Sequence, residues 1–563
     1  MNRVRRVVCA LAFAAFATLG QTPANYHQRA DEALESFLLK FWDGPNQYLR
    51  HRYPSDGALT GYWTFANGWA ALVDGVERSG KSQYYGLIDT FYDGQNQRGW
   101  GSDYYDDLCW MIDSLLRSYD LTGDSKYLNQ AKSIFANVQA AWDVSCCGSV
   151  RGGVWWDKAH TQKATASNAG AALAAARLYR RTGAAAYLTF ARQVFSFWST
   201  QMVDSSTGQV CDHINPSGEK VWWKFTYNEG LMIGAALELY EATGESTFLT
   251  QAHRYAGFMV ANEVTATAHG NVLSDGSNAT CTGDCAQFKG PAYRYLARLH
   301  ARSPRTAYAN VLRASEEGIW NLARDASGNT FATCWAGPPE TAVEMMEQNA
   351  AATALSRFAQ QSGPYATTIR TNVFEAENAV IHNIPLEALY AGYHGWGYLA
   401  GWNADGQSVD FRISFATAGT HTLTFSYSAG AGNASRNVVI NGVEAFTNLT
   451  FPGTGAWSSY NTVSMTRTLP AGTSVITVRF DSARGSANWL NLDYLQIPNY
   501  TPPPPGPIAA KLGYPFVTLT WNSPGFLQAA PSITGPWTDW TNSPPSPANL
   551  TIPSTAQFFR IRQ

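Results

Sequence analysis

Two adjacent carboxylates, Asp106 and Asp107, are the side chains of this sequence whose type and spacing are best suited to catalysis. They directly precede the apolar run at 111–116, which places them where a helix begins. Because neighbouring Cα atoms are about 3.8 Å apart, splayed side chains can bring the carboxyl carbons near the separation of about 5–5.5 Å that retaining glycosidases use. Mutual repulsion would push the two pKa values apart, so that one carboxylate serves as nucleophile while the other holds a proton as general acid.

The same pair also has a purely structural explanation, because aspartates near a helix N-terminus cap free N–H groups and complement the helix dipole. The surroundings favour the catalytic interpretation. Similar aromatic and polar clusters occur in other connections: Tyr62-Trp63 to Asn67, Gly152-Gly-Val-Trp155-Trp156-Asp157, Trp222-Trp223 to Tyr227-Asn228-Glu229, and Phe288-Lys289-Gly290. If the helices form a ring, these connections share one end of it, although each aromatic alone is more often part of a core.

A repeated helical hairpin supplies the elements that would carry these residues. Tyr119-Asp-Leu-Thr-Gly123, Tyr179-Arg-Arg-Thr-Gly183 and Tyr240-Glu-Ala-Thr-Gly244 each indicate a helix end with a glycine cap, and their glycines are 60 and 61 residues apart. The predicted helices cover 25–43, 62–79, 82–93, 105–121, 124–142, 167–181, 185–202, 228–242, 246–263, 288–301, 305–323 and 347–360. Twelve helices in six pairs would close into an (α/α)6 toroid, whereas an open helical solenoid would satisfy the same period.

The composition changes near Thr371, where helical periodicity gives way to alternation. Between 373 and 498, β-branched residues alternate with polar ones between glycine-rich turns, a pattern typical of an all-β sandwich. We therefore predict an all-α (α/α)6 domain at 21–365 and a jelly-roll β-sandwich at 373–498. A proline-rich linker at 499–507 and a small β module at 508–563 follow.

The N-terminus has the features of an export signal. Arg3, Arg5 and Arg6 precede an apolar run at 7–20 that is too short to span a bilayer. No later stretch is long and apolar enough for a transmembrane helix. We therefore predict a signal peptide at 1–20 and a secreted protein, extracellular or periplasmic.

Charge and cysteine content argue against two classes of function. Lys plus Arg is 40 and Asp plus Glu is 42, so the net charge of −2 gives no field for holding nucleic acid or an anionic membrane. No C-x-x-C pair accompanies suitably spaced histidines, which argues against structural zinc. Cys281 and Cys285 can close a small disulfide loop, and Cys146, Cys147 and Cys211 can supply a second pair.

Six short stretches, taken in order, make most of residues 26–361 resemble glycoside hydrolase family 76, the endo-α-1,6-mannanases. The stretches are Trp63-Thr-Phe-Ala-Asn67-Gly-Trp, Tyr105-Asp106-Asp107, Gly152-Gly-Val-Trp-Trp-Asp157, Ala166-Ser-Asn168 through Gly183, Phe225-Thr-Tyr-Asn228-Glu-Gly230 and Phe288-Lys-Gly290. The resemblance implies an (α/α)6 barrel and a retaining, double-displacement cleavage of α-1,6-mannosidic bonds.

Mapped onto the matching residues, the resemblance implies that Asp106 is the nucleophile and Asp107 the acid/base. An aspartate of the family falls near Asp212, which is expected to contact substrate. The other substrate-binding residues expected are Asn67, Trp155, Trp156, Asn168, Tyr227, Asn228 and Lys289. The chain departs from the family at Cys211, where an aromatic residue is common, and at Glu229, which replaces a frequent glutamine.

The sandwich resembles carbohydrate-binding modules of families 6 and 35 at its two ends, Phe374-Glu375-Ala-Glu377 and Asn488-Trp-Leu-Asn-Leu-Asp493. The resemblance implies a structural Ca²⁺ held by Glu375, Glu377 and Asp493, and solvated edge carboxylates are the alternative. Sugar contacts in such modules combine an aromatic platform with an amide or a carboxylate. The candidates are Tyr393, Trp396, Trp457 and Asn488.

Together these patterns predict a secreted, monomeric, endo-acting glycoside hydrolase that cleaves α-1,6-linkages in α-mannan and needs no catalytic cofactor. Two other functions stay open. Another (α/α)6 enzyme, such as an unsaturated glucuronyl hydrolase or a polysaccharide lyase, would need basic residues converging on an acidic sugar, and Lys289 is the main base in the motif connections. A non-catalytic polysaccharide-binding protein would have no need of both Asp106 and Asp107.

Overall fold

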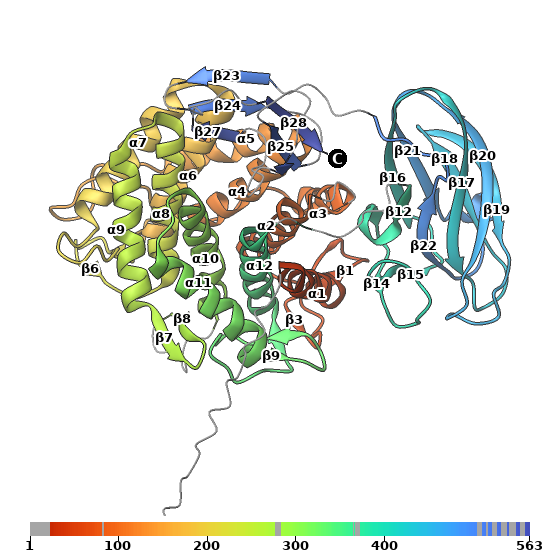
Figure 1. Ribbon diagram of the computed structural model, residues 1–563, viewed down its shortest axis with the longest axis horizontal. Coiled ribbons are helices and arrows are strands. Elements are labelled where there is room, and N and C mark those ends of the chain that lie inside the picture. Colours follow the sequence, from red (N-terminus) through yellow and green to blue (C-terminus); the bar gives the residue numbers. More distant parts are fainter. Residues whose placement is uncertain are drawn as a thin grey trace, which may run out of the picture.

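The computed structural model describes residues 23–80, 84–275, 283–363, 365, 372–503, 509–513, 516–520, 526–530, 538–539, 548–551 and 558–562. The predicted signal peptide at 1–20 and Cys281 lie outside these residues. Figure 1 shows a helical domain, coloured red to green, beside a β-sandwich coloured turquoise to blue. Within the described residues, no helix has the length and apolar character needed to cross a membrane.

Six inner helices of 18 residues each form a closed ring. They are α2 (Tyr62–Ser79), α4 (Tyr105–Thr122), α6 (Thr165–Thr182), α8 (Thr226–Thr243), α10 (Cys285–Arg302) and α12 (Met345–Ser362). Each contacts the next in this order, and α12 returns to contact α2. The closed ring confirms the (α/α)6 prediction and excludes the open solenoid.

The outer helices pack against this ring. They are α1 (Pro23–Phe41), α3 (Tyr85–Arg98), α5 (Ser125–Ala140), α7 (Ala185–Gln201), α9 (Ser246–Asn262) and α11 (Thr306–Gly318), the last continued by a π-helical turn at Ile319–Ala323. Gly123, Gly183 and Gly244 end three inner helices in the left-handed conformation, where glycine carries no Cβ penalty. The predicted cap repeat is therefore confirmed.

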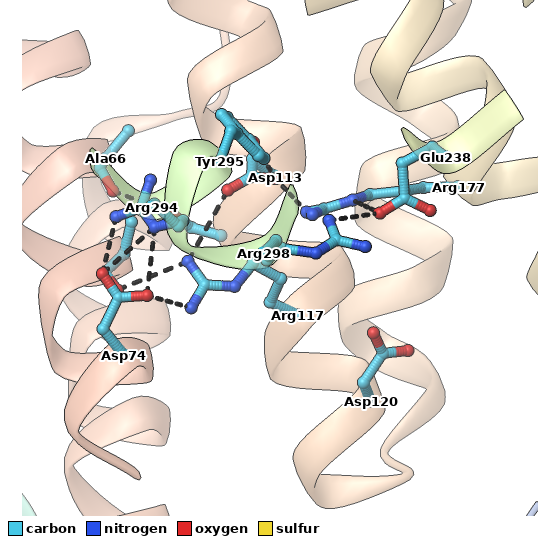
Figure 2. A network of polar contacts seen from close by, with 12 residues as sticks. Ala66, Asp74, Asp113, Arg117, Asp120, Arg177, Glu238, Arg294, Tyr295 and Arg298 are labelled. Atoms are coloured by element: carbon cyan, nitrogen blue, oxygen red, sulfur yellow. Dashed lines mark hydrogen bonds and ion pairs between the residues drawn. The ribbon is translucent and has the colours of Figure 1, made fainter. Parts of the chain in front are cut away.

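Ion pairs cross the ring in the second half of the inner helices (Figure 2). A charged residue is the thirteenth of five of them: Asp74 in α2, Arg117 in α4, Arg177 in α6, Glu238 in α8 and Arg357 in α12. Arg117 and Arg357 pair with Asp74, and Arg177 pairs with Glu238 at 2.9 Å. Because paired residues lie at the same height, the inner helices run parallel and their N-termini share the opposite end.

Short strands, which the sequence patterns did not reveal, tie the connections together. The three-stranded antiparallel sheet of β4 (Lys163–Ala164), β5 (His213–Ile214) and β6 (Lys220–Val221) joins two connections at the N-terminal end of the ring. The others are β1 (Trp42–Asp43), β2 (Tyr48–Leu49), β3 (Arg52–Tyr53), β7 (Val264–Thr267), β8 (Gly270–Leu273), β9 (Arg324–Asp325), β10 (Thr330–Phe331) and β11 (Val343–Glu344). Most have two residues, too few for an alternating pattern to be recognised.

The second domain is a sandwich of two antiparallel sheets, as predicted. One has the order β14-β15-β22-β17-β20 with β12 beside β22, and the other has the order β13-β16-β21-β18-β19. The strands are β12 (Val373–Glu375), β13 (Val380–His382), β14 (Leu386–Glu387), β15 (Tyr398–Trp402), β16 (Ser408–Phe415), β17 (Gly419–Ser428), β18 (Ala434–Ile440), β19 (Val443–Phe451), β20 (Asn461–Leu469), β21 (Gly472–Arg479) and β22 (Leu490–Gln496). Inward residues such as Leu423 and Phe425 alternate with polar ones along β17.

The sandwich is docked directly on the helical domain through α3. Thr90 Oγ1 on α3 accepts a hydrogen bond from Ile381 N at 2.9 Å, and Gln47 Nε2 donates to Ile381 O at 2.9 Å. A Cβ atom at Gly86 would lie 2.4 Å from the carbonyl carbon of Ala379, so this close backbone approach requires glycine. The module is therefore held in a fixed orientation beside the ring.

The C-terminal segment forms two three-stranded antiparallel sheets. Their strands are β23 (Ala509–Gly513), β24 (Phe516–Thr520) and β27 (Ala548–Thr551), and β25 (Phe526–Ala530), β26 (Thr538–Asp539) and β28 (Phe558–Arg562). In the helical domain, Cys146 and Cys147 form a disulfide, whereas Cys211 is a free, buried thiol. Cys285 is also disulfide-bonded.

Candidate active site

Asp106 lies in the first turn of α4, where the connection before α4 meets the connection before α6. Tyr105 N donates to Trp156 O at 2.7 Å, and Tyr104 forms a β-bridge with Asp157. This bridge places the Trp156 indole over the helix start, where its Nε1 donates to Asp106 Oδ2 at 3.0 Å. The other carboxyl oxygen of Asp106 is buried and has no hydrogen-bond partner.

Asp107 is held by the same connection. Ser102 Oγ donates to Asp107 Oδ2 at 2.7 Å, and 9% of the Asp107 surface is exposed. The two aspartates therefore each have one donor from outside the pair, Trp156 for Asp106 and Ser102 for Asp107. Neither forms an ion pair among the described residues, so no cation offsets the cost of two adjacent negative charges.

The two carboxyl groups share their protons as a pair. Burial raises the pKa of Asp106, and the neighbouring charge of Asp107 raises it further, while the N–H of Trp156 acts in the opposite direction. Burial also raises the pKa of Asp107, which Ser102 lowers and the charge of Asp284 raises. The pair therefore keeps a proton at a higher pH than isolated aspartates would, as a general acid requires.

Asp212 is the centre of a second cluster beside the first. Tyr227 OH donates to Asp212 Oδ2 at 2.9 Å and Asn228 Nδ2 donates to the same oxygen at 3.1 Å. The Nδ1 atom of His213 lies 2.6 Å from Asp212 Oδ1. Burial raises the pKa of Tyr227, with further contributions from the charges of Asp212 and Asp106, so Tyr227 lies within electrostatic range of both carboxylates.

Two expected substrate contacts instead support the connection that carries Trp156. Asn168 is fully buried, its Oδ1 accepts from Val154 N at 2.8 Å, and its Nδ2 donates to Val154 O at 2.9 Å. Trp155 is buried with its ring 4.6 Å below the Nζ of Lys163 and stacked on His160. In this structure neighbouring groups therefore occupy the polar atoms of Asn168 and the ring of Trp155, and both residues support the connection.

Two further expected contacts are also occupied within the protein. Lys289 is 3% exposed, and its Nζ lies 3.5 Å from Asp275 Oδ2. Asn67 is 2% exposed and donates to Trp63 O at 3.1 Å. Both side chains are therefore buried in this structure, and their substrate contacts stay predictions.

Sequence reasoning missed three side chains that the structure adds to the site. Ser102 and Tyr104 stand in the same motif as the aspartates, and the Tyr104 ring lies 4.8 Å from that of Trp156 with 42% of its surface exposed. Trp223 is 55% exposed, and its ring lies 5.1 Å from that of His213. An exposed aromatic beside each carboxylate cluster gives a sugar chain apolar faces on which to stack.

In the sandwich, the four expected sugar contacts differ in their exposure. Trp396 is buried and its Nε1 donates to Asn378 Oδ1 at 3.0 Å, so its ring is covered in this structure. Tyr393 and Trp457 are half-buried. Asn488 bonds backbone carbonyls of the 431–433 turn, and its neighbour Trp489, which was not predicted as a contact, is 45% exposed.

The three carboxylates expected to hold Ca²⁺ lie together and are buried. The charges of Glu375 and Asp493 add to burial in raising the pKa of Glu377, whose Oε2 has no hydrogen-bond partner. His394 Nδ1 bonds Glu375 Oε1, and Ser426 Oγ donates to Asp493 Oδ2 at 2.9 Å. Among the described residues, no three His, Cys, Asp or Glu side chains are arranged to hold a metal ion.

Two family models match the chain. The model of glycosyl hydrolase family 76 matches residues 25–368, and that of carbohydrate binding module family 6 matches residues 380–499. The first match contains the helical ring, and the second contains the β-sandwich from β13 onward and leaves β12 outside.

Known proteins are similar to parts of the chain. An isomaltosyltransferase of Sporosarcina globispora is 33% identical over 124 residues, 22% of this chain and 11% of that protein. A mannan endo-1,6-alpha-mannosidase of Saccharomyces cerevisiae is 31% identical over 170 residues, 27% of this chain and 34% of that protein. The chain thus spans a third or less of the length of these curated relatives.

A solved structure is similar to the helical domain. It is an inactive variant of the α-1,6-mannanase GH76A of Salegentibacter sp. HEL1_6 in complex with α-1,6-mannotriose, with 25% identity and a TM-score of 0.54. The similarity covers 59% of this chain and 99% of that one. In that inactive variant two consecutive aspartates are replaced by asparagine.

Proposed function

Because the chain belongs to glycosyl hydrolase family 76, we propose that it is a secreted, endo-acting hydrolase of α-1,6-mannosidic bonds in mannan-type polysaccharides. The observation that carries this proposal is the pair Asp106 and Asp107, buried without a cation at the N-terminal end of the ring. An α-1,6-mannanase and an α-1,6-mannosidase among the similar proteins support the substrate class. The family 6 module beside the ring supports a polymeric carbohydrate as partner.

The reaction we propose is a double displacement. Asp106, whose Oδ2 is held by Trp156, attacks the anomeric carbon while Asp107 gives its proton to the departing glycosidic oxygen. These roles require the shared proton to lie on Asp107 when the sugar is bound, because in the free protein burial and the charge of Asp107 raise the pKa of Asp106 to about 8, above the value of about 6 for Asp107. The C–O bond breaks, an ester forms between Asp106 and the sugar, and Asp107 is left ionised. Asp107 then takes a proton from water, whose oxygen adds to the anomeric carbon and releases the Asp106 carboxylate.

The Asp212 cluster would bind the sugar on the same side of the ring. Its carboxylate accepts from Tyr227 and Asn228 and so has a fixed orientation. A carboxylate accepts hydrogen bonds from sugar hydroxyl groups, and burial strengthens such bonds because water competes less. Tyr104 and Trp223 would stack on neighbouring sugar rings.

The test is product analysis after incubation of the mature protein with linear α-1,6-mannan. Wild type should release short manno-oligosaccharides whose first-formed reducing end keeps the α configuration, as read by proton NMR. Asp106→Asn and Asp107→Asn should each lose at least about a thousandfold in kcat/KM. Asp103→Asn is the matched control, because Asp103 is an exposed carboxylate of the same connection and should leave turnover unchanged.

Two results would contradict the proposal. Release of β-configured ends by wild type would exclude the double displacement, because one inversion would then have occurred. Wild-type-like hydrolysis by Asp106→Asn would remove the pair from catalysis. No release from linear mannan by folded wild type would exclude this substrate.

We also propose that the sandwich binds Ca²⁺ through Glu375, Glu377 and Asp493, which must rearrange to do so because the three carboxylates are not arranged to hold a metal ion in this structure. The donors are hard oxygens, which Ca²⁺ prefers, and a cation there would relieve the repulsion that holds the pKa of Glu377 up. Because His394 bonds Glu375 in the structure, binding requires that this contact opens. The full chain should melt at a higher temperature in calcium than in chelator, and Glu377→Gln should abolish the difference. Equal melting of the parent under both conditions would exclude the site.

A further inference from the structure

Two buried glutamates lie behind the Asp212 cluster and face each other. Glu229, in the first turn of α8, is 1% exposed, and Glu263, which follows α9, is 2% exposed. Each carboxyl group acts on the pKa of the other, so the two side chains lie in contact. Val210 N donates to Glu229 Oε1 at 2.7 Å, but Glu229 Oε2 and both carboxyl oxygens of Glu263 are buried and have no hydrogen-bond partner in the part of the chain that the structure describes.

The charges around this pair do not offset two negative charges. Asp275, after β8, adds a third carboxylate that itself bonds Thr226 N and pairs with Lys289 on α10. Lys224, in the connection before α8, is exposed, and its positive charge lowers the pKa of Glu263 against the effect of burial. Burial raises the pKa of Glu229 and of Glu263, and the charge of Asp275 raises both further. One proton between the two carboxyls satisfies their facing oxygens.

The pair is connected to the site through a short segment of backbone. Val210, which Glu229 holds, is two residues from Asp212. Tyr227 and Asn228, which precede Glu229 on α8, donate to Asp212 itself. Three hydrogen bonds therefore join the 210–212 segment to consecutive residues of α8, one at its first residue and two at its last. Backbone hydrogen bonds from Cys211 N to Met202 O and from Asp212 N to Val221 O also hold this segment.

We propose that Glu229 and Glu263 share one proton and thereby act as a positioning pair that holds Asp212 in the orientation that binds the sugar. This inference rests on the proposed function, because it takes an α-1,6-mannan chain as the ligand of Asp212. When the shared proton leaves to solvent, two adjacent anions repel each other in a poorly polarisable environment. Glu229 then withdraws from Val210, and the segment that carries Asp212 loses one of the hydrogen bonds that join it to α8.

A glutamine at either position should replace the shared proton by a permanent N–H donor. Glu229→Gln keeps the acceptor for Val210 N and cannot ionise, and Glu263→Gln donates to Glu229 without repelling it. Both variants should therefore preserve the position of Asp212 at a pH where the parent loses it.

The experiment measures sugar binding without catalysis. In the full chain carrying Asp106→Asn and Asp107→Asn, the Kd for α-1,6-mannotriose is determined by calorimetry at about pH 7.5 and about pH 9, above the range in which imidazole ordinarily takes up a proton. The parent of this series should bind about fivefold to tenfold more weakly at the higher pH, because fewer molecules then hold the competent arrangement. Addition of Glu229→Gln or Glu263→Gln should reduce this change to less than about twofold.

Glu316→Gln is the matched control. Glu316 is a buried glutamate of α11 that pairs with Arg29 at 2.8 Å, and its variant should keep the pH dependence of the parent. Melting temperatures at both pH values show that each variant is folded. The inference is overturned if Glu229→Gln and the parent weaken equally, or if folded glutamine variants fail to bind at either pH.

A second readout keeps this inference separate from the proposed function. If the parent does not bind mannotriose at any pH, the proposed function fails, and thermal unfolding still tests the shared proton. Raised pKa values in the folded state mean that stability is lost as pH rises above the unfolded value, so the melting temperature of the parent should fall more steeply between about pH 5 and 9 than that of Glu229→Gln. Parallel curves would exclude a shared proton.

Discussion

At one end of the inner helices Asp74 is surrounded by three guanidinium groups, whereas at the other end Asp106 has a second carboxylate as its neighbour. Burial alone would raise the pKa of Asp74, but Arg117, Arg294 and Arg357 outweigh it and hold that pKa well below its usual range. At Asp106, burial and Asp107 act in the same direction, and the pKa is raised.

One end of the ring therefore holds the helices together, and the other end carries the groups that can transfer a proton. The ion pairs of Figure 2 hold the pKa values of Asp74 and Glu238 well below their usual range, which keeps these carboxylates charged and fixes the helices relative to one another but leaves them no proton to transfer. Glu238, with Arg177, Arg180 and Arg298 around it, follows the same rule and has a lowered pKa although it is buried. At the opposite end, Asp106 and Asp107 repel each other and no cation in the described ranges offsets their charges. This repulsion raises their pKa values, as a group that must both hold and release a proton requires.

The largest expected effect is the loss of Asp74. Asp74→Asn should lower the free energy of unfolding by about 3–5 kcal/mol, because three buried guanidinium groups lose their shared anion. The folded pKa is depressed, so this stabilisation is present above the unfolded pKa of 3.8 and is lost as pH falls. Chemical denaturation at neutral pH measures the effect.

The control for this variant is an exposed ion pair. The side chains of Arg192 and Glu245 form an ion pair, and both are about half exposed. Glu245→Gln removes this pair and should lower the free energy of unfolding by no more than about 1 kcal/mol. If Asp74→Asn lowers the free energy of unfolding as little as Glu245→Gln does, the stability of the ring does not depend on its buried ion pairs.

At the end that carries Asp106 and Asp107, we expect removal of a carboxylate to raise the free energy of unfolding. Asp107→Asn should raise the free energy of unfolding by about 1–3 kcal/mol at pH 8, because it removes a charge that burial disfavours. The folded pKa of Asp107 is raised to about 6, so the parent loses stability as pH rises from its unfolded value of 3.8 through 6, and the gain of the variant should vanish near pH 4. Thermal unfolding at the two pH values measures this, and an equal or lower melting temperature at pH 8 would contradict the stored repulsion.

The sequence contained part of this contrast. The ring itself was predictable, because the glycine caps repeat, and so was the pair at the start of α4. The charged end was missed although it has the same period: Asp74, Arg117, Arg177, Glu238 and Arg357 each lie six residues before the glycine that follows their helix. A charged residue recurring at one height of apolar helices is a signal for a buried ion-pair layer.

Other features of the site were not readable from the chain. Asn168 and Lys289 stand in motifs rich in aromatic residues and look like ligands, but their partners, Val154 and Asp275, are fixed by how the connections fold back. The two-residue strands β4 and β5 bring Asp212 beside α6 through pairings between segments about fifty residues apart, which no local periodicity encodes. The burial of Trp396 depends on packing within the sandwich, which the local sequence does not show.

The smallest expected effect concerns the contribution of a single N–H donor to the pKa of Asp106. The Trp156 N–H lowers the pKa of Asp106 against the effect of burial, so Trp156→Phe should shift the acidic limb of the kcat/KM profile upward by about half to one pH unit. Trp155→Phe is the matched control, because the Trp155 ring lies beneath Lys163 and stacks on His160, whereas the Trp156 indole bonds Asp106. If both variants shift the limb equally, the effect comes from the packing of the connection, and if neither shifts it, the single N–H donor does not set the protonation of the pair.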